Sequence, residues 1–374
     1  MGFHIVKREN CPFWQKCCLY LGAVVLAVLI GACILVAIGV SPVKYYTRMF
    51  TMNMIGNRIS HVILINYLKK LVPLALTSVA LSLAFKMKFW NIGGEGQFIM
   101  GAVASAFVAL KWGASMNKAL ALILMCLAAM LAAGLYGLIA AWLKVKFNTN
   151  ETLMTLMLNY IALYFLIFLS EQRKDWNLFL DSESLRPKFA SFSNILKMPV
   201  FKIGAKFELN LCVVLTAIIG ILIFVYLKYT KHGYEISVIG DSAGTANYAG
   251  MNVKRIILRT VFLSAALIGL AAAFRVGTAG ILSTSITEDV GWTGIIVAWL
   301  AKLNTGMIFL VSALICVLQQ GSVEAATSFS QVSSSFANIL QGLILFLVLT
   351  ADFFTRFRIV RAKKGENANG KGKV

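Results

Sequence analysis

The chain has too little charge to cover the surface of a soluble protein. Only 13% of its 374 residues are charged, whereas 59% are hydrophobic. Soluble domains carry about 25% charged residues, so this composition excludes an ordinary soluble fold. The long apolar runs instead predict an all-α, polytopic integral membrane protein, because helices satisfy their own backbone hydrogen bonds in lipid.

The residues that build metal and catalytic sites are also scarce. The three histidines, at positions 4, 61 and 232, show no metal or triad spacing, and the seven cysteines show no paired zinc spacing. The stretch Gly365–Gly372 resembles a phosphate-binding loop but ends in Gly where Ser or Thr should bind magnesium. We therefore expect no catalytic residue, no metal, no cofactor and no ATP hydrolysis by this chain alone.

Acidic residues are outnumbered, which gives a formal net charge of +20. Such an excess can indicate nucleic-acid binding, but the basic residues lie between apolar runs rather than on one polar face. Cationic loops beside membrane spans explain this pattern. We expect no nucleic-acid partner.

Apolar runs predict about ten transmembrane helices, each needing about 20 residues. The segments that this assignment places in the cytoplasm carry the larger share of the 35 Lys and Arg residues, which predicts two cytoplasmic termini. The predicted spans are 19–40, 71–85, 93–110, 119–142, 153–170, 209–227, 259–276, 292–304, 306–321 and 336–354, of which the second, third and eighth are short or broken.

Three segments follow from this assignment. Residues 1–18 form a cytoplasmic N-terminal segment, 19–354 form a single transmembrane domain, and 355–374 form a basic, disordered cytoplasmic tail. The transmembrane domain contains a long outer loop at 171–208 and a cytoplasmic loop at 228–258.

One polar stretch, Asn91-Ile-Gly-Gly-Glu-Gly-Gln97, interrupts the apolar sequence on either side of it. Polar, irregular backbone at membrane depth is tolerated only where it is packed in protein or lines a wet cavity. The stretch therefore indicates a helix break beside a translocation path. For Glu95 the alternative is a structural carboxylate that accepts hydrogen bonds from backbone N–H groups freed by the glycines.

Two stretches place a small residue at every fourth position, which predicts close helix packing. The first stretch is Ala129, Ala133, Gly137 and Ala141, and the second is Ala265, Gly269, Ala273 and Gly277.

The loop 228–258 has charges at both ends and small residues from Ala243 to Gly250. A short helix of small residues can seat in a groove on another protein without steric cost. The alternative is a plain connection between two helices.

Four stretches now support a family resemblance. Gly240-x-x-x-x-Thr245-Ala246-x-Tyr248-x-Gly250-Met resembles the cytoplasmic coupling segment of ATP-binding-cassette (ABC) importer permeases that serve ribose, branched-chain amino acids and nucleosides. Asn91–Gln97 resembles the Phe-Asn-Ile-Gly-x-Glu-Gly-Gln stretch of the nucleoside members, with Trp90 replacing Phe. Asn150–Tyr160 resembles their Asn-Glu-x-x-x-x-Leu-Met-x-Asn-Tyr stretch, and Gly291–Ala298 is a weaker fourth match. Ser242 and Thr245 depart from the family's usual Asn and Ala.

The resemblance implies a permease subunit that moves nucleosides, purine nucleosides above all, across the plasma (inner) membrane of a bacterium. It implies separate cytosolic ATPase subunits docked on 240–251, a second, related but different permease subunit, and an extracytoplasmic substrate-binding lipoprotein. The substrate-binding residues that it suggests are Asn91, Glu95, Gln97, Asn159 and Tyr160. The ATPase-coupling residues that it suggests are Gly240, Thr245, Ala246, Tyr248 and Gly250.

Several alternatives remain open at this point. Asn159 and Tyr160 could serve helix packing instead, and Trp292 and Trp299 could stack a base or anchor the chain at the membrane interface. The cargo could be a sugar or a branched-chain amino acid, although an amino acid needs a cationic partner that Glu95 does not supply. A carrier driven by an ion gradient could use Glu95 beside a broken helix, but it has no use for an ATPase-docking segment.

Overall fold

The computed structural model describes residues 3–7, 12–52, 54, 59–113, 115–172, 176–181, 184, 187–192, 196–203 and 207–361. In these ranges thirteen helices and four short strands account for the regular structure, which confirms the all-α class. The predicted disordered tail lies outside the described residues from position 362 on, and the loop 171–208 is described in part.

The chain divides into two compact units, the first made of residues 1–53 and 318–374. This unit contains β1 (Phe3–Lys7), α1 (Phe13–Ala37), α2 (Pro42–Phe50), α13 (Phe336–Arg356) and β4 (Phe357–Arg361). Helix α1 packs along α13, and β1 pairs antiparallel with β4. The ring of Tyr45 packs against Phe329 and Phe336, and its hydroxyl lies 2.9 Å from the hydroxyl of Ser322.

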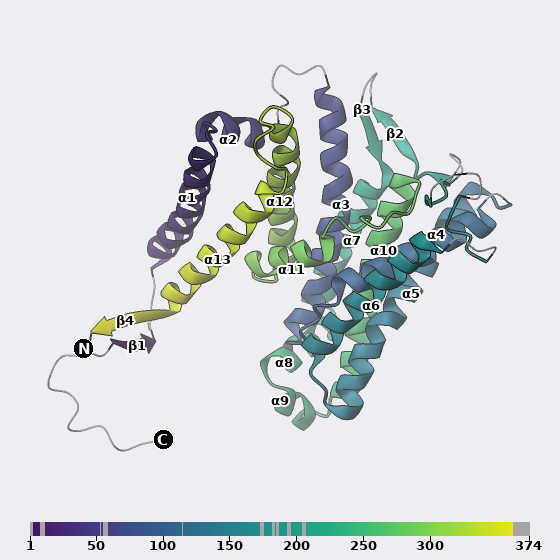
Figure 1. Cartoon of the computed structure of the whole chain (residues 1–374). Helices are drawn as coiled ribbons and strands as arrows, with labels where there is room; N and C mark the ends of the chain where they lie inside the picture. Colours follow the sequence, from purple (N-terminus) through teal and green to yellow (C-terminus); the bar gives the residue numbers. More distant parts are fainter. Residues whose placement is uncertain are drawn as a thin grey trace. The chain divides into compact units, whose positions relative to one another are not determined.

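The second unit, residues 54–317, holds most of the helices (Figure 1). Helix α12 (Thr305–Ala326) begins in this unit and ends in the first. The other elements of the second unit are α3 (Ser60–Lys86), α4 (Gly94–Trp112), α5 (Lys118–Phe147), α6 (Glu151–Glu171), β2 (Val200–Ile203), β3 (Phe207–Asn210), α7 (Leu211–Tyr229), α8 (Lys231–Asp241), α9 (Ala243–Tyr248), α10 (Val253–Ala279) and α11 (Val290–Leu300). The β2–β3 hairpin and the α8–α9 pair lie at opposite ends of this unit in Figure 1.

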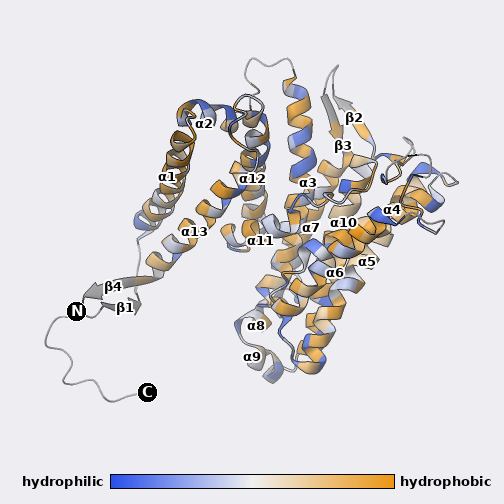
Figure 2. Ribbon diagram, viewed as in Figure 1, coloured by the Kyte–Doolittle hydropathy of each residue, from blue (hydrophilic) through white to orange (hydrophobic). Residues whose placement is uncertain are grey.

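Helices α3 and α10 form the centre of the second unit. In their most apolar stretches, 78% and 67% of the residues are buried, against 28% in α5. Helix α10 packs on α3, α4 and α5, and α11 packs on α3 and α4. Figure 2 shows hydrophobic residues along most of α5 and α6. The exposed leucine and isoleucine side chains of α5 repeat every three or four residues and form a face suited to lipid, which includes Ile123, Leu127, Leu131 and Leu135.

The two predicted stripes of small residues face each other, on α5 and α10. A Cβ added at Gly269 would lie 2.2 Å from the carbonyl oxygen of Ala129, and one added at Gly137 would lie 2.6 Å from the Cβ of Ala265. Helix α4 joins the same contact, since a Cβ at Gly101 would lie 2.7 Å from the Cα of Gly269. The predicted close packing is confirmed, and it locks α4, α5 and α10 together.

The predicted span boundaries need correction. Within the described residues, eight helices are long and apolar enough to cross a membrane. The third and eighth predicted spans correspond to α4, whose first turn is polar, and to α11, which has only 11 residues; neither is among the eight. The second predicted span, 71–85, was too short, because α3 begins at Ser60 and continues through Lys69, Lys70 and Pro73.

Replacing Gly269 by Ala should destabilise the protein, because the added methyl group has no space against the backbone of α5. We expect a loss of about 1–3 kcal/mol, measured as a lower midpoint of thermal unfolding in detergent. Gly22→Ala is the matched control: a Cβ there meets nothing within 4 Å, and alanine favours the helix by about 1 kcal/mol. Equal midpoints for the two variants would contradict the close contact.

Candidate functional site

The polar stretch 91–97, which we call the polar turn, ends the connection from α3 and forms the first turn of α4, and all of it except Ile92 is buried. The side-chain oxygen of Asn91 accepts hydrogen bonds from the N–H of Gly93 (3.1 Å) and from the amide nitrogen of Gln97 (3.0 Å). The amide nitrogen of Asn91 donates in return to the side-chain oxygen of Gln97 (3.1 Å). The two amides therefore satisfy each other and fold the turn on itself.

Helix α6 supplies the next partners of the polar turn. The amide nitrogen of Asn159 donates to the carbonyl of Ile92 (2.9 Å), and its oxygen accepts from the N–H of Gly96 (2.8 Å). The hydroxyl of Thr155 accepts from the N–H of Ile92 (3.2 Å). Backbone groups that the helix break leaves free thus find partners on α6, as the low-dielectric interior requires.

Glu95 reaches a third element, the start of α11. Its carboxylate accepts a hydrogen bond from the N–H of Gly291 (2.8 Å), and also from the hydroxyl of Thr287 and the N–H of Trp292. Asp289, the residue before α11, makes no side-chain capping bond. The carboxylate of Glu95 therefore acts as the cap of α11, where the helix dipole favours negative charge.

The structure brings together four of the five suggested substrate-binding residues, because Asn91, Glu95, Gln97 and Asn159 are all buried in or against the polar turn. Tyr160 lies on α6 with half of its surface exposed. The N–H groups bonded to Glu95 belong to α11 and not to the glycines of the polar turn, which corrects the structural alternative that the sequence suggested.

Sequence reasoning missed the roles of Thr155 and Gly291. A Cβ at Gly291 would lie 2.3 Å from the backbone nitrogen of Glu95, so only glycine fits at this contact. Both residues lie inside stretches that resemble the permease family, and that resemblance was the feature of the sequence that could have pointed to them.

Aromatic rings lie next to the polar turn. The rings of Trp90 and Trp299 stack with centroids 5.2 Å apart and planes 15° apart, and the ring of Phe85 packs against both. Trp90 is 45% exposed. Trp90, the residue just before the polar turn, thus keeps part of its ring exposed although one face is stacked on Trp299.

The suggested coupling stretch begins at the last residues of α8 and contains α9, and Ser242 joins the two helices. The hydroxyl of Ser242 caps α9 by accepting from the N–H of Thr245 (3.2 Å). At the other end Gly250 has φ +75°, in the left-handed region that favours glycine. This conformation lets the N–H of Met251 reach the carbonyl of Ala246 (3.0 Å) and end the helix. The predicted short helix is confirmed.

The α8–α9 pair has an anchored side and an exposed side. Gly240 and Ala246 are buried, and a Cβ at Gly240 would lie 2.0 Å from the carbonyl oxygen of Lys86. Ala246 belongs to an apolar cluster with Ala84, Met87, Phe89, Ala141, Ile236, Ile239, Ile256 and Val261. Thr245 and Gly250 are exposed, and Tyr248 is 96% exposed.

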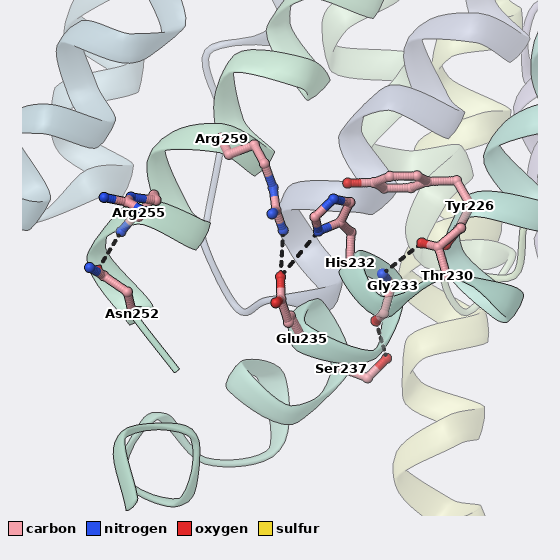
Figure 3. Close-up of polar contacts among 9 residues, drawn as sticks. All are labelled: Tyr226, Thr230, His232, Gly233, Glu235, Ser237, Asn252, Arg255 and Arg259. Carbon is pink, nitrogen blue, oxygen red and sulfur yellow. Dashed lines mark hydrogen bonds and ion pairs between the residues drawn. The ribbon is translucent and has the colours of Figure 1, made fainter. Parts of the chain in front are cut away.

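An ion pair also ties α8 to α10 (Figure 3). The guanidinium of Arg259 donates to the carboxylate of Glu235 (2.8 Å), and Nδ1 of His232 lies 3.3 Å from the same oxygen. The hydrogen bond from Arg259 lowers the pKa of Glu235 below its usual value, so Glu235 is charged at neutral pH. Sequence reasoning missed this pair, although Glu235 and Asp241 are the only acids in the basic loop 228–258.

The fold is that of a multi-pass membrane protein: its described residues contain eight helices long and apolar enough to cross a membrane, a buried polar turn and an exposed pair of short helices. Residues 63–349 match the family described as "Branched-chain amino acid transport system / permease component", and the chain belongs to this family. It is thus an ABC-type permease subunit, and in such systems ATP hydrolysis lies on separate subunits.

Three relatives illustrate the range of this family. The glucose ABC transporter permease TsgB13 of Haloferax volcanii is 28% identical over 94% of this chain and 92% of its own length. The guanosine ABC transporter permease NupP of Bacillus subtilis is 26% identical over 91% and 95%. The nucleoside ABC transporter permease NupB of Lactococcus lactis is 27% identical over 80% and 82%. These names include both nucleoside and sugar permeases.

Replacing Asn159 by Leu should destabilise the protein, because the carbonyl of Ile92 and the N–H of Gly96 lose their partner inside the core. An unsatisfied buried group costs about 1–3 kcal/mol, so the midpoint of thermal unfolding should fall clearly. Tyr160→Leu, at the half-exposed neighbouring position, is the control and should change the midpoint little. A similar midpoint for both variants would contradict the bonding role of Asn159.

Proposed function

We propose that this permease imports nucleosides, with purine nucleosides preferred, and that cytosolic ATPase subunits drive it through α9. The observation that carries the proposal is the α8–α9 pair of an ABC-type permease, anchored on one side and exposed on the other. Alternating access then follows if the docked ATPase contacts α9 differently in its two nucleotide states.

The exposed side of α9 supports the docking assignment. Tyr248, with 96% of its surface exposed, is the kind of side chain that anchors protein interfaces. Thr245, Tyr248 and Gly250 would contact the ATPase, while Gly240 and Ala246 would hold α9 against the body of the subunit. Departures from the family's usual residues at Ser242 and Thr245 would change fine contacts only.

The chemistry around the polar turn supports a nucleoside. Amides and a carboxylate suit the hydroxyls of ribose, and the exposed part of the Trp90 ring suits a flat base. We propose that Asn91, Glu95, Gln97 and Asn159 exchange some of their internal bonds for substrate bonds as access alternates, with Tyr160 contributing from α6. The relatives NupP, a guanosine permease, and NupB, a nucleoside permease, agree with this cargo.

A sugar is the second candidate. TsgB13 and the fructose import permease FruG of Bifidobacterium longum, which is 27% identical over 71% of this chain, favour it by their names. A sugar would use the same hydroxyl-binding groups but would not need the aromatic face of Trp90.

The remaining parts of the assembly follow from the same proposal. A second permease subunit of different but related sequence would complete the translocation path, and an extracytoplasmic lipoprotein would deliver substrate. The protein would lie in the plasma (inner) membrane of a bacterium with both termini in the cytoplasm, because the basic loops favour that orientation.

Uptake into proteoliposomes that contain the complete transporter tests the cargo. Excess unlabelled guanosine should abolish uptake of labelled guanosine, whereas glucose, ribose and leucine should leave it unchanged. Glu95→Gln should lower uptake about fivefold at normal assembly, since a carboxylate at a helix N-terminus contributes about 1 kcal/mol. Glucose uptake that guanosine does not inhibit would establish the sugar alternative instead, and normal guanosine uptake by Glu95→Gln would remove Glu95 from the site.

Gly250→Arg should uncouple the transporter while the protein still reaches the membrane. Arginine resists the left-handed backbone and would add bulk at the exposed end of α9. Gly250→Asn is the control, because asparagine tolerates this backbone conformation. We expect loss of ATPase co-purification for the arginine variant and near-normal yield for the asparagine variant. Full ATPase yield with substrate-stimulated hydrolysis in Gly250→Arg would refute docking at this end of α9.

A further inference from the structure

Two of the three arginines of helix α10, one toward each end, bond to carboxylates on different elements. Arg259 bonds to Glu235 on α8, and Arg275 bonds to Glu288 in the connection that leads into α11. At 1.5 Å per residue the 16 positions between the two arginines span about 24 Å. One rigid helix thus links the α8–α9 pair to the start of α11.

We propose that the Glu235–Arg259 pair is the positioning contact that transmits movement of α8–α9 to α10, and that Arg275 and Glu288 pass this movement to α11 beside Glu95. The inference rests on the proposed docking of an ATPase on α9 and adds the route by which that docking reaches the polar turn.

The pair near α9 has the geometry of a directional contact. The Glu235 side chain is only 12% exposed and that of Arg259 is 34% exposed, so water screens the pair less than a surface pair. His232 approaches the same oxygen, and the ring of Tyr226 lies beside that of His232, with centroids 6.0 Å apart and planes tilted by 39° (Figure 3). The apolar cluster around Ala246 holds α9 without directional bonds, whereas the charged hydrogen bond between Arg259 and Glu235 fixes α8 to α10 in one direction.

The middle of α10 transmits force because it cannot deform locally. Gly269 lies against the backbone of α5 and the Cα of Gly101 on α4, so a bend there would produce overlap. Packed helices with such contacts move as one body. A displacement at Arg259 therefore reaches Arg275.

The far end of α10 meets a strained connection. Glu288 and Asp289 have φ values of +44° and +58°, in the left-handed region that non-glycine residues rarely adopt. The carboxylate of Glu288 bonds to Arg275 and lies 3.8 Å from Nζ of Lys70 on α3. Strained backbone of this kind persists only while its surroundings hold it. Movement of Arg275 would release the connection and shift the first turn of α11, which Glu95 caps.

The test uses the complete transporter in proteoliposomes and measures guanosine molecules moved per ATP hydrolysed. Glu235→Gln keeps the size of the side chain and removes its charge, and it should lower this ratio at least about fivefold, the lower range of coupling effects. Glu235→Arg and Arg259→Glu should each lower the ratio, and the double variant should restore it to within about twofold. Glu288→Gln should lower the same ratio from the far end.

Lys144→Gln is the matched control. It removes an ion pair of similar exposure, between Lys144 and Glu151 (2.9 Å), that joins α5 to α6 and involves neither α8 nor α10. This variant should keep the ratio of the unmodified transporter. The control shows whether the loss of any ion pair, and not only of the Glu235–Arg259 pair, lowers the transport ratio. If Lys144→Gln lowers the ratio as much as Glu235→Gln does, the proposal is overturned.

Co-purification of the ATPase separates the inference from the function on which it rests. If the unmodified permease retains no ATPase, the proposed function fails. If Glu235→Gln retains the ATPase and its transport ratio is unchanged, only the positioning role of Glu235 fails. If the charge-reversed double variant stays as low as the single variants, pairing with Arg259 is overturned. If charge reversal prevents assembly of the transporter, the transport ratio of Glu235→Gln alone tests the role of Glu235. An unchanged ratio in Glu288→Gln would overturn the proposed transmission from Arg275 to α11.

Discussion

The structure depends on one constraint: backbone groups that leave a helix inside an apolar interior must find partners in the protein. The polar turn frees such groups between α3 and α4. Asn91 satisfies the N–H of Gly93 within the turn, and Asn159 satisfies the N–H of Gly96 and the carbonyl of Ile92 from α6. Glu95 in turn satisfies the first turn of α11. The same hydrogen bonds that make the break tolerable therefore fix the positions of α4, α6 and α11 around it.

Close helix packing completes this arrangement. The small residues of α5 and α10 bring the two backbones together and leave no space at Gly269. Hydrogen bonds thus fix the first turns of α4 and α11, and close packing of small residues fixes the central parts of α5 and α10. The α8–α9 pair is exposed on one side and is tied to α10 by the ion pair between Glu235 and Arg259, which is why we propose it as the place where a docked ATPase acts.

Much of the fold could be predicted from the sequence, and the errors have a physical cause. Apolar runs located the long helices, but α3 begins eleven residues before the predicted span at 71, because its polar residues are helical as well. Most of residues 60–70 are partly buried, so this part of α3 does not need a uniformly apolar surface. The group of Asn91, Glu95, Gln97 and Asn159 was predicted from the residues and the resemblance, yet the partner of Glu95 was not. Gly291 lies 196 positions away, and no local pattern connects the two.

By itself the sequence determined the class of protein, the small-residue stripes, the break at 91–97 and the short helix near Gly250, because each depends on hydropathy or on local backbone preference. Only the tertiary structure decided which stripe faces which, that Gly240 and Ala246 point inward while Tyr248 points outward, and that Arg259 meets Glu235. These facts depend on how helices distant in sequence pack together. A contact between two helices that are far apart in the sequence depends on the shape and charge of both helices, so neither segment by itself predicts it.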